Sequence, residues 1–159
     1  MLALLALLLV VASVLLLREA ALADPGDPEA RTLSKQYDAV TRAAREETLA
    51  FLAVDHKDMD PLIEKVLAGA TGSFKEQYEA ARGKLKASAR ASQAISTGKV
   101  ISVGVGDIDD SHAVVLVAAD SQVRNRSTGG KPQPSYHRLE LTMTRQGDTW
   151  LTSDLRFVG

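Results

Sequence analysis

Hydrophobic positions run almost without interruption through the first part of the chain. Residues 1–17 are Leu, Ala, Val and Met except for Ser13, and Arg18 is the first charged residue. A helix of about 17 residues is ~25 Å long, and extension to Leu22 spans a ~30 Å hydrocarbon core because charged side chains near the end snorkel to the interface. The pattern predicts a transmembrane anchor over residues 1–23.

A cleaved signal peptide is a second interpretation of the same stretch. Ala21-Leu22-Ala23 is a small-x-small triplet of the kind that signal peptidase cuts, and cleavage there would leave Asp24 at the N-terminus. Against this interpretation, nothing basic precedes the apolar run, which is also longer than the roughly 7–15 residues of a usual signal-peptide core. The uncleaved anchor is therefore preferred, and a helix buried in the protein core is the third alternative.

The linker comes next. Residues 24–32 include Pro25 and Pro28, which prevent the anchor helix from continuing. The sequence therefore divides into an anchor, this linker and one soluble domain over residues 33–159. Arg18 and Arg31 flank the anchor on the domain side, so the positive-inside rule taken literally places the domain in the cytoplasm, although two charges decide little.

The first helix of the domain is predicted from Ala30 or Leu33 to Ala53. Its apolar positions recur at spacings of three and four, as one face of a 3.6-residue period requires: Tyr37, Val40, Ala44, Thr48, Phe51 and Leu52. Four charged residues are predicted to lie mostly off this face: Arg42, Arg45, Glu46 and Glu47.

A short helix and a long helix follow. Asp60 is predicted to cap a helix over Pro61–Leu67, because Pro is favoured at the first helical position. Gly69 suits the C-terminal cap of that helix. A second start signal is the capping box formed by Ser73 and Glu76, from which the long helix is predicted to run to about Ile95.

The hydrophobic period changes from 3.6 to two after Gly98, which predicts strands. Four are expected: Val100–Val105, His112–Val123, Tyr136–Arg145 and Thr149–Val158. Helices followed by strands that hairpins connect indicate an α+β domain, with about three helices packed on a curved four-stranded antiparallel sheet. Such a sheet, curled around its helices, forms a half-open cone.

Composition excludes several classes of function. The net charge of −1 gives no electrostatic case for nucleic-acid binding, and the absence of Cys excludes disulfides, thiolate catalysis and Cys-based metal sites. Aromatic residues make up only 4% of the chain, which argues against an aromatic base-stacking platform.

The histidines and one acidic loop are the candidate metal ligands, and neither pattern fits. His56, His112 and His137 lack the i, i+4 spacing of a helical metal pair, so they are expected to bind no metal. In the loop with Asp107 and Asp109, the glycine and the glutamate of a calcium-binding loop are missing, so a solvated hairpin turn is favoured.

Aspartates near the short helix are the candidates for a general base. Asp55, Asp58 and Asp60 would lie close to the cone, although Asp60 is already explained as a cap and Asp58 as a polar loop residue. No glycine-rich phosphate loop or nucleophile elbow is present. We therefore assign no catalytic, cofactor-binding or metal-ligating residue, and we expect no cofactor.

Several short motifs, in this order and spacing, resemble those of the actinobacterial Mce-associated membrane proteins over essentially the whole chain. They are Ala-Val-Thr-Arg-Ala-Ala-Arg at 39–45, Asp-Met-Asp at 58–60, Ala-Thr-Gly-Ser-Phe at 70–74 with Tyr78, Gly-Lys-Val at 98–100, and Gly-Asp-Thr-Trp-Leu-Thr-Ser-Asp-Leu at 147–155. The resemblance implies a cone similar to the nuclear-transport-factor-like and SnoaL-like proteins. It also implies a single-pass protein of the cytoplasmic membrane whose soluble domain lies on the extracytoplasmic side.

The resemblance further implies a non-catalytic accessory subunit that stabilises or assembles an Mce-type importer of fatty acids or sterols. Its partners would be Mce-family subunits and the permease, together with membrane lipid around the N-terminal helix. Two alternatives remain open: a cone that holds a hydrophobic ligand, and an isomerase- or cyclase-like enzyme with Asp58 or Asp60 as the base. An enzyme should bury a carboxylate in an apolar pocket with a raised pKa.

Overall fold

The computed structural model of the protein describes residues 28–159. The predicted anchor over residues 1–23, its orientation and most of the linker lie outside these residues and stay predictions. Within the described part of the chain, no helix is both long enough and apolar enough to cross a membrane. The chain divides into two units, Met1–Gln36 and Tyr37–Gly159, and the packing described below is that of the second unit.

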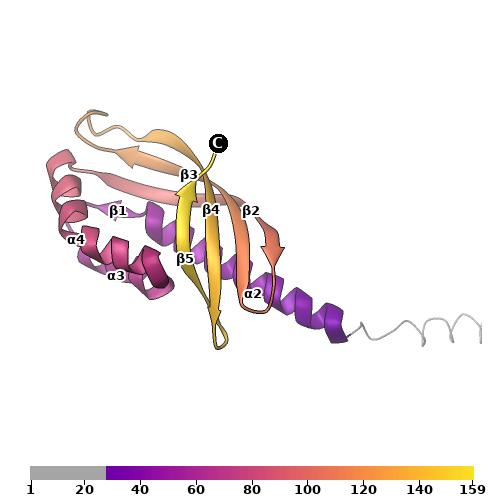
Figure 1. The fold of residues 1–159 in the computed structure, drawn as a ribbon. Helices are drawn as coiled ribbons and strands as arrows, with labels where there is room; N and C mark the ends of the chain where they lie inside the picture. The colour runs from indigo at the N-terminus through magenta and orange to yellow at the C-terminus, as the bar shows by residue number, and fades with distance from the viewer. Residues whose placement is uncertain (1–27) are drawn as a thin grey trace, which may run out of the picture. The chain divides into compact units, whose positions relative to one another are not determined.

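The prediction of three helices is confirmed within residues 28–159, whereas the sheet has five strands rather than four. The helices are α2 (Pro28–Leu52), α3 (Asp60–Gly69) and α4 (Gly72–Ser92). The strands are β1 (Val54–Asp55), β2 (Ile95–Ile108), β3 (His112–Arg124), β4 (Gln133–Gln146) and β5 (Thr149–Phe157). The sheet is antiparallel throughout and its strand order is β1-β2-β3-β4-β5 (Figure 1).

The missed strand, β1, is short. Val54 and Asp55 pair with Ser96 and Ile95. The sequence pattern predicted no strand at 54–55 and placed Ile95 at the end of the long helix. The long helix ends before this segment because Gln93 adopts a left-handed conformation with φ 53°, and its N–H bonds to the carbonyls of the last helical turn. β2 therefore begins at Ile95 rather than at Val100.

Both predicted N-terminal helix caps are wrong. Met59 stands at the N-cap position of α3, and Asp60 is the first residue inside the helix. Thr71 precedes α4 in an extended conformation, without a hydrogen bond from its side chain to the helix. Ser73 instead donates a hydrogen bond of 3.3 Å to the Ser153 carbonyl oxygen. In both cases a tertiary contact engages the side chain that local sequence had assigned to a cap.

The main core lies between α2 and the inner face of the sheet. Val40 and Ala44 of α2 are fully buried, as are Leu139, Leu141 and Met143 of β4. These side chains meet because the period of α2 and the alternation of β4 each place one apolar face toward the other. The interior of the unit is thus occupied by side chains.

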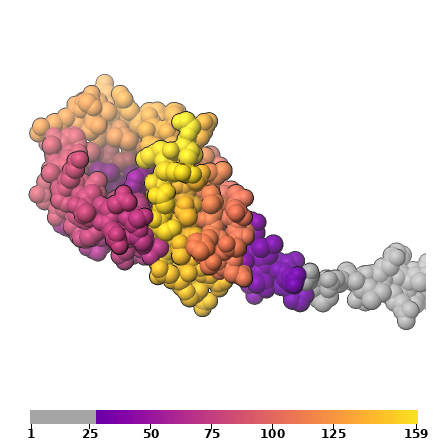
Figure 2. Space-filling view, viewed as in Figure 1, coloured from indigo at the N-terminus to yellow at the C-terminus, as the bar shows by residue number. Residues whose placement is uncertain are grey.

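The connection between α3 and α4 lies along the edge of β5. The Thr71 N–H donates to the Thr152 carbonyl oxygen at 2.8 Å, and Ala70 forms a parallel bridge with Thr152. This pairing covers part of an otherwise free strand edge. Figures 1 and 2 show the consequence, with α3 and α4 beside β5. The first residues of β5 are thereby brought close to the end of α3.

Aromatic side chains join α2 to α4. The ring centroid of Phe51 on α2 lies 6.3 Å from that of Phe74 and 6.2 Å from that of Tyr78, both on α4. Phe157 of β5 lies 6.1 Å from Phe51. Phe74 and Tyr78 therefore anchor α4 against α2.

Candidate functional site

The aspartates proposed as bases lie on the surface. Asp58 is exposed, and its N–H closes a turn on the Asp55 carbonyl oxygen at 3.0 Å. Both carboxylate oxygens of Asp60 lie 2.7 Å from Lys86 Nζ, and Arg82 is 3.8 Å away. The hydrogen bond from Lys86 holds the pKa of Asp60 below its usual value. A carboxylate with a lowered pKa is a weaker base, so these contacts indicate an ion pair between α3 and α4.

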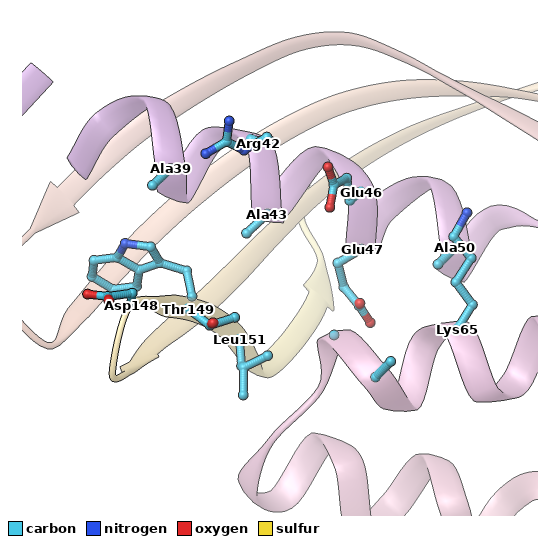
Figure 3. A pocket seen from close by; sticks show the side chains of 13 residues that line it. Ala39, Arg42, Ala43, Glu46, Glu47, Ala50, Lys65, Asp148, Thr149 and Leu151 are labelled. Atoms are coloured by element: carbon cyan, nitrogen blue, oxygen red, sulfur yellow. The ribbon is translucent and has the colours of Figure 1, made fainter. Parts of the chain in front are cut away.

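A different carboxyl lines the main candidate pocket. The pocket has a volume of about 390 Å³ and lies between α2, the end of α3 and the start of β5 (Figure 3). We call it the Glu47 pocket. It is lined by Ala39, Arg42, Ala43, Glu46, Glu47, Ala50, Lys65, Ala68, Gly69, Asp148, Thr149, Trp150 and Leu151.

Glu47 is the unusual member of this set because it is charged in water and buried here. Its exposed fraction is 3%, and its Oε1 atom is buried with no hydrogen-bond partner among the described residues. Burial raises the pKa of the Glu47 carboxyl to about 8. At neutral pH this group is therefore mostly protonated, and a protonated carboxyl is a hydrogen-bond donor.

The end of α3 is shaped around this carboxyl. A β-carbon added to Gly69 would lie 2.0 Å from Glu47 Oε2, so any other residue at 69 would require the carboxyl to move. Figure 3 shows the Glu47 side chain extending from α2 toward the end of α3. The glycine that the sequence assigned to a helix cap is the last residue of α3 and provides room for Glu47.

The wall of the pocket is made of small apolar side chains, and its margin is charged. Ala39, Ala43 and Ala50 of α2 face the pocket together with Leu151 of β5 (Figure 3). Trp150, which also lines it, is 4% exposed and belongs to the main core. At the margin, two cationic side chains, Arg42 and Lys65, are matched in number by two anionic ones, Glu46 and Asp148.

Tyr78 on α4 is a titratable group whose pKa depends on the charge of Glu47. Burial raises the pKa of its phenol, and the negative charge of Glu47, when present, raises it further. The phenol therefore stays protonated over the range in which Glu47 titrates.

The histidines lie in separate surroundings. The ring Nε2 of His137 is 2.9 Å from Ser121 Oγ, and the ring Nδ1 of His112 is 2.9 Å from Ser111 Oγ. His56 lies in the turn after β1. Within residues 28–159, no group of three His, Asp or Glu side chains is arranged to hold a metal ion.

The acidic loop is a hairpin turn, as expected. Asp109 Oδ1 accepts hydrogen bonds of 2.7 Å from the backbone N–H groups of Ser111 and His112. These bonds lower the pKa of Asp109. The carboxylate is thus used to close the turn between β2 and β3.

Sequence reasoning missed Glu47, although a signal was present. The sequence was interpreted as placing Glu47 mostly off the apolar face of α2, and this is wrong. Glu47 follows Ala44 by three residues and precedes Phe51 by four, so its spacing puts it on the buried face. A charged residue at an apolar position of a helical period is the feature that could have identified it.

Comparison with known proteins identifies relatives and a fold. The chain is 27% identical over 130 residues to "Uncharacterized protein Rv1363c" of Mycobacterium tuberculosis, and the match covers 82% of this chain and 49% of that protein. The chain therefore spans about half the length of this relative.

Three solved structures show the fold alone. CagV, a VirB8 homolog of a type IV secretion system from Helicobacter pylori, has a TM-score of 0.59 at 6% identity, over 76% of this chain and 97% of that chain. The periplasmic domain of DotI has a TM-score of 0.57 at 10% identity, over 86% and 98%. An "Ntf2 like protein involved in plasmid conjugation" has a TM-score of 0.50 at 11% identity, over 80% and 49%.

The architecture is thus that of the nuclear-transport-factor-like proteins, in agreement with the cone expected from the sequence. The family model described as "Uncharacterized protein Rv1363c/MT1408-like" matches residues 2–159, and this chain belongs to that family.

Proposed function

We propose that this chain is a membrane-anchored, non-catalytic accessory subunit of an Mce-type lipid importer, with its α+β domain on the extracytoplasmic side of the cytoplasmic membrane. The domain would contact Mce-family subunits or the permease and stabilise their assembly. The apolar run over residues 1–17 supports the anchor. The fold shared with the periplasmic domain of DotI supports an envelope location by analogy.

The observation that carries the proposal is the outer face of the sheet. On that face Leu116 is 46% exposed and Tyr136 is 77% exposed, although Val115 and Val117, on the inner face beside Leu116, are buried. A shallow groove of about 380 Å³ runs along β2, β3 and β4 beside Leu116. Large apolar side chains at the surface are typical of protein–protein contacts.

The motifs of the resemblance have structural roles that suit a scaffold. Thr71 and Gly72 connect α3 to α4, and Gly72 adopts a φ of 54° there. Trp150 packs in the core, and Leu151 next to it is only half-buried. The alternative enzyme, with Asp58 or Asp60 as base, finds little support because Asp60 is tied to Lys86 on the surface.

Co-purification tests this function. The full chain, tagged at its C-terminus and extracted from membranes in mild detergent, should retain Mce-family subunits or the permease, and its deletion should lower their abundance and lipid uptake. Asp58→Asn and Asp60→Asn should leave uptake normal at equal protein abundance. Unchanged uptake and importer abundance on deletion would contradict the accessory role, and lost uptake in an intact complex carrying either Asn variant would favour an enzyme.

A further inference from the structure

We propose that the Glu47 pocket binds an uncharged, mainly apolar molecule through a carbonyl or hydroxyl oxygen, which accepts a hydrogen bond from the Glu47 carboxyl. This inference does not depend on the importer or on the membrane anchor. It rests on the fit of four features of residues 37–159: an unpartnered buried carboxyl, a glycine that makes room for it, a wall of small side chains and a balanced margin.

The first step concerns the unpartnered oxygen. Buried polar atoms are nearly always hydrogen-bonded, and an unpaired one costs stability. Glu47 Oε1 is buried without a hydrogen-bond partner in residues 28–159, beside a pocket of about 390 Å³. A leucine or glutamine at this position would avoid the cost of burying an ionisable carboxyl. A molecule in the pocket that carries an oxygen would supply the missing hydrogen bond.

The second step concerns size and polarity. The volume of about 390 Å³ lies in the lower part of the range of small-molecule pockets, roughly 300–1,000 Å³. The alanines at 39, 43, 50 and 68 make the lining apolar and leave room in the pocket. The indole of Trp150 and the side chain of Leu151 add apolar surface. Such a wall contacts a hydrocarbon or ring skeleton. It offers few hydrogen bonds to a sugar or a nucleotide.

The third step concerns charge. Among the residues that line the pocket, the cationic Arg42 and Lys65 are matched in number by the anionic Glu46 and Asp148. With Glu47 protonated, the lining carries no net charge. A bound carboxylate or ammonium would lose its hydration in a pocket whose lining has no net charge to offset that loss, which is unfavourable. The pocket therefore favours a neutral molecule.

The fourth step concerns the proton. Burial raises the pKa of Glu47 to about 8, so the carboxyl can donate its O–H to an acceptor at pH 7. The charged and titratable groups around it are Tyr78 on α4, Lys65 on α3, Arg42 and Glu46 on α2, and Asp148 before β5. Because the pKa of Tyr78 is raised above its ordinary value, Glu47 is the group expected to titrate between pH 7 and pH 9.

The experiment titrates the full chain in detergent with 2-nonanone, and with nonanoate as the charged counterpart of similar length. Binding is followed by the backbone amide NMR signals of Gly69 and Leu151 and by the fluorescence of Trp150, the single tryptophan of the chain. We expect saturable binding of 2-nonanone at pH 7 and at least about tenfold weaker binding of nonanoate. Loss of the proton should weaken binding of the ketone about tenfold between pH 7 and pH 9.

Matched variants separate binding through the carboxyl from a purely structural role. Glu47→Gln keeps the size and an N–H donor, so it should bind 2-nonanone within about threefold of wild type and lose the dependence on pH. Glu47→Leu should bind at least about tenfold more weakly at pH 7, because it removes the donor. Ala68→Phe fills the pocket from an exposed position and should abolish binding without unfolding the domain.

The proposal is overturned if 2-nonanone fails to saturate up to its solubility limit, if Glu47→Leu binds it as tightly as wild type does, or if nonanoate binds more tightly. Each variant is checked first for a native amide spectrum. Should Glu47→Leu fail that check, Ala68→Phe and the pH profile of Glu47→Gln still decide the outcome. Importer co-purification is measured separately. A failure of ligand binding therefore does not contradict the accessory role, and a failure of co-purification does not contradict ligand binding.

Discussion

The carboxyl of Glu47 occupies the space that a side chain at residue 69 would need, since a β-carbon on Gly69 would lie 2.0 Å from Glu47 Oε2. Gly69 is the last residue of α3, and glycine within a helix costs about 1 kcal/mol relative to alanine. The chain therefore combines two locally unfavourable residues, a buried carboxyl and a helical glycine. The carboxyl explains the glycine, because it occupies the space that a side chain at residue 69 would need.

Replacement of Gly69 by alanine should be harmful only while Glu47 is present. In wild type, Gly69→Ala should lower the free energy of unfolding by about 1–3 kcal/mol, because the new methyl group displaces a buried side chain. In a Glu47→Ala background the same change should be neutral or should stabilise by up to about 1 kcal/mol, through helix propensity. Denaturant unfolding of the four proteins gives the coupling energy. Equal effects in both backgrounds would contradict the contact.

Glu47 should make the domain less stable as pH rises. The carboxyl has a pKa of about 8 in the folded protein and an ordinary value of 4.5, so between these values the folded state holds a proton that the unfolded state has released. The free energy of unfolding should then fall with increasing pH, by about 1.4 kcal/mol per unit from this group.

The comparison between wild type and Glu47→Gln isolates this effect, because other groups titrate in both proteins. The difference in stability between the two should shift in favour of Glu47→Gln by about 2–3 kcal/mol from pH 5 to pH 7. Chemical denaturation at the two pH values measures it. A difference that does not change with pH would show that the carboxyl ionises in the fold as it does in water.

The ion pair between α3 and α4 should contribute little to stability. The pKa of Asp60 is lowered by Lys86, so its contribution is present at neutral pH and is lost as pH falls through the lowered value. The Asp60 side chain is 55% exposed, and solvent and salt screen the pair. Asp60→Asn, Lys86→Met and the double variant should therefore unfold at nearly the same denaturant concentration as wild type in high salt. A large loss in either single variant would restore a structural role for Asp60.

The outer face of the sheet should carry the partner contact. Leu116→Arg should reduce recovery of the importer subunits at least about tenfold while changing the stability of the domain by less than about 1 kcal/mol, because Leu116 contributes little to the core. Gln122→Arg is the matched control, since Gln122 is exposed and lies on the same strand and face as Leu116. Equal loss with both variants would indicate non-specific repulsion.

The anchor predicts that the protein stays in the membrane. Carbonate washing of membranes should leave the full-length chain in the pellet, because only detergent releases a helix that spans the hydrocarbon core. The measurement is a mass determination of the intact protein in the pellet and the supernatant. A mature protein that begins at Asp24 and appears in the supernatant would favour the signal-peptide interpretation.

Local patterns in the sequence predicted the elements well where period and turn chemistry agreed. The period of two predicted strands over Tyr136–Arg145 and Thr149–Val158, close to the observed β4 (Gln133–Gln146) and β5 (Thr149–Phe157). These features depend on neighbours in the sequence. They could be read without knowing the rest of the fold.

The errors arose where distant segments compete for a side chain. Ser73 has the spacing of a capping box, but the edge of β5 lies close enough to accept its hydrogen bond. Asp60 has the spacing of a cap, but Lys86 is one helix away. The Glu47 pocket combines three segments that are separated in sequence, so no local pattern predicts it. The local signal was a charged residue at an apolar position of the α2 period, and it was missed.

The strand order has a consequence for synthesis of the protein. Each strand pairs with the next in the chain, whereas α2, which is made before all five strands, is covered by strands that are made later. The packing around Val40 and Ala44 cannot be completed until β4 has been made, and the α3–α4 connection has no edge to pair with until β5 appears. The nascent chain therefore exposes the apolar face of α2 during elongation, and the domain is complete only when its final hairpin has formed.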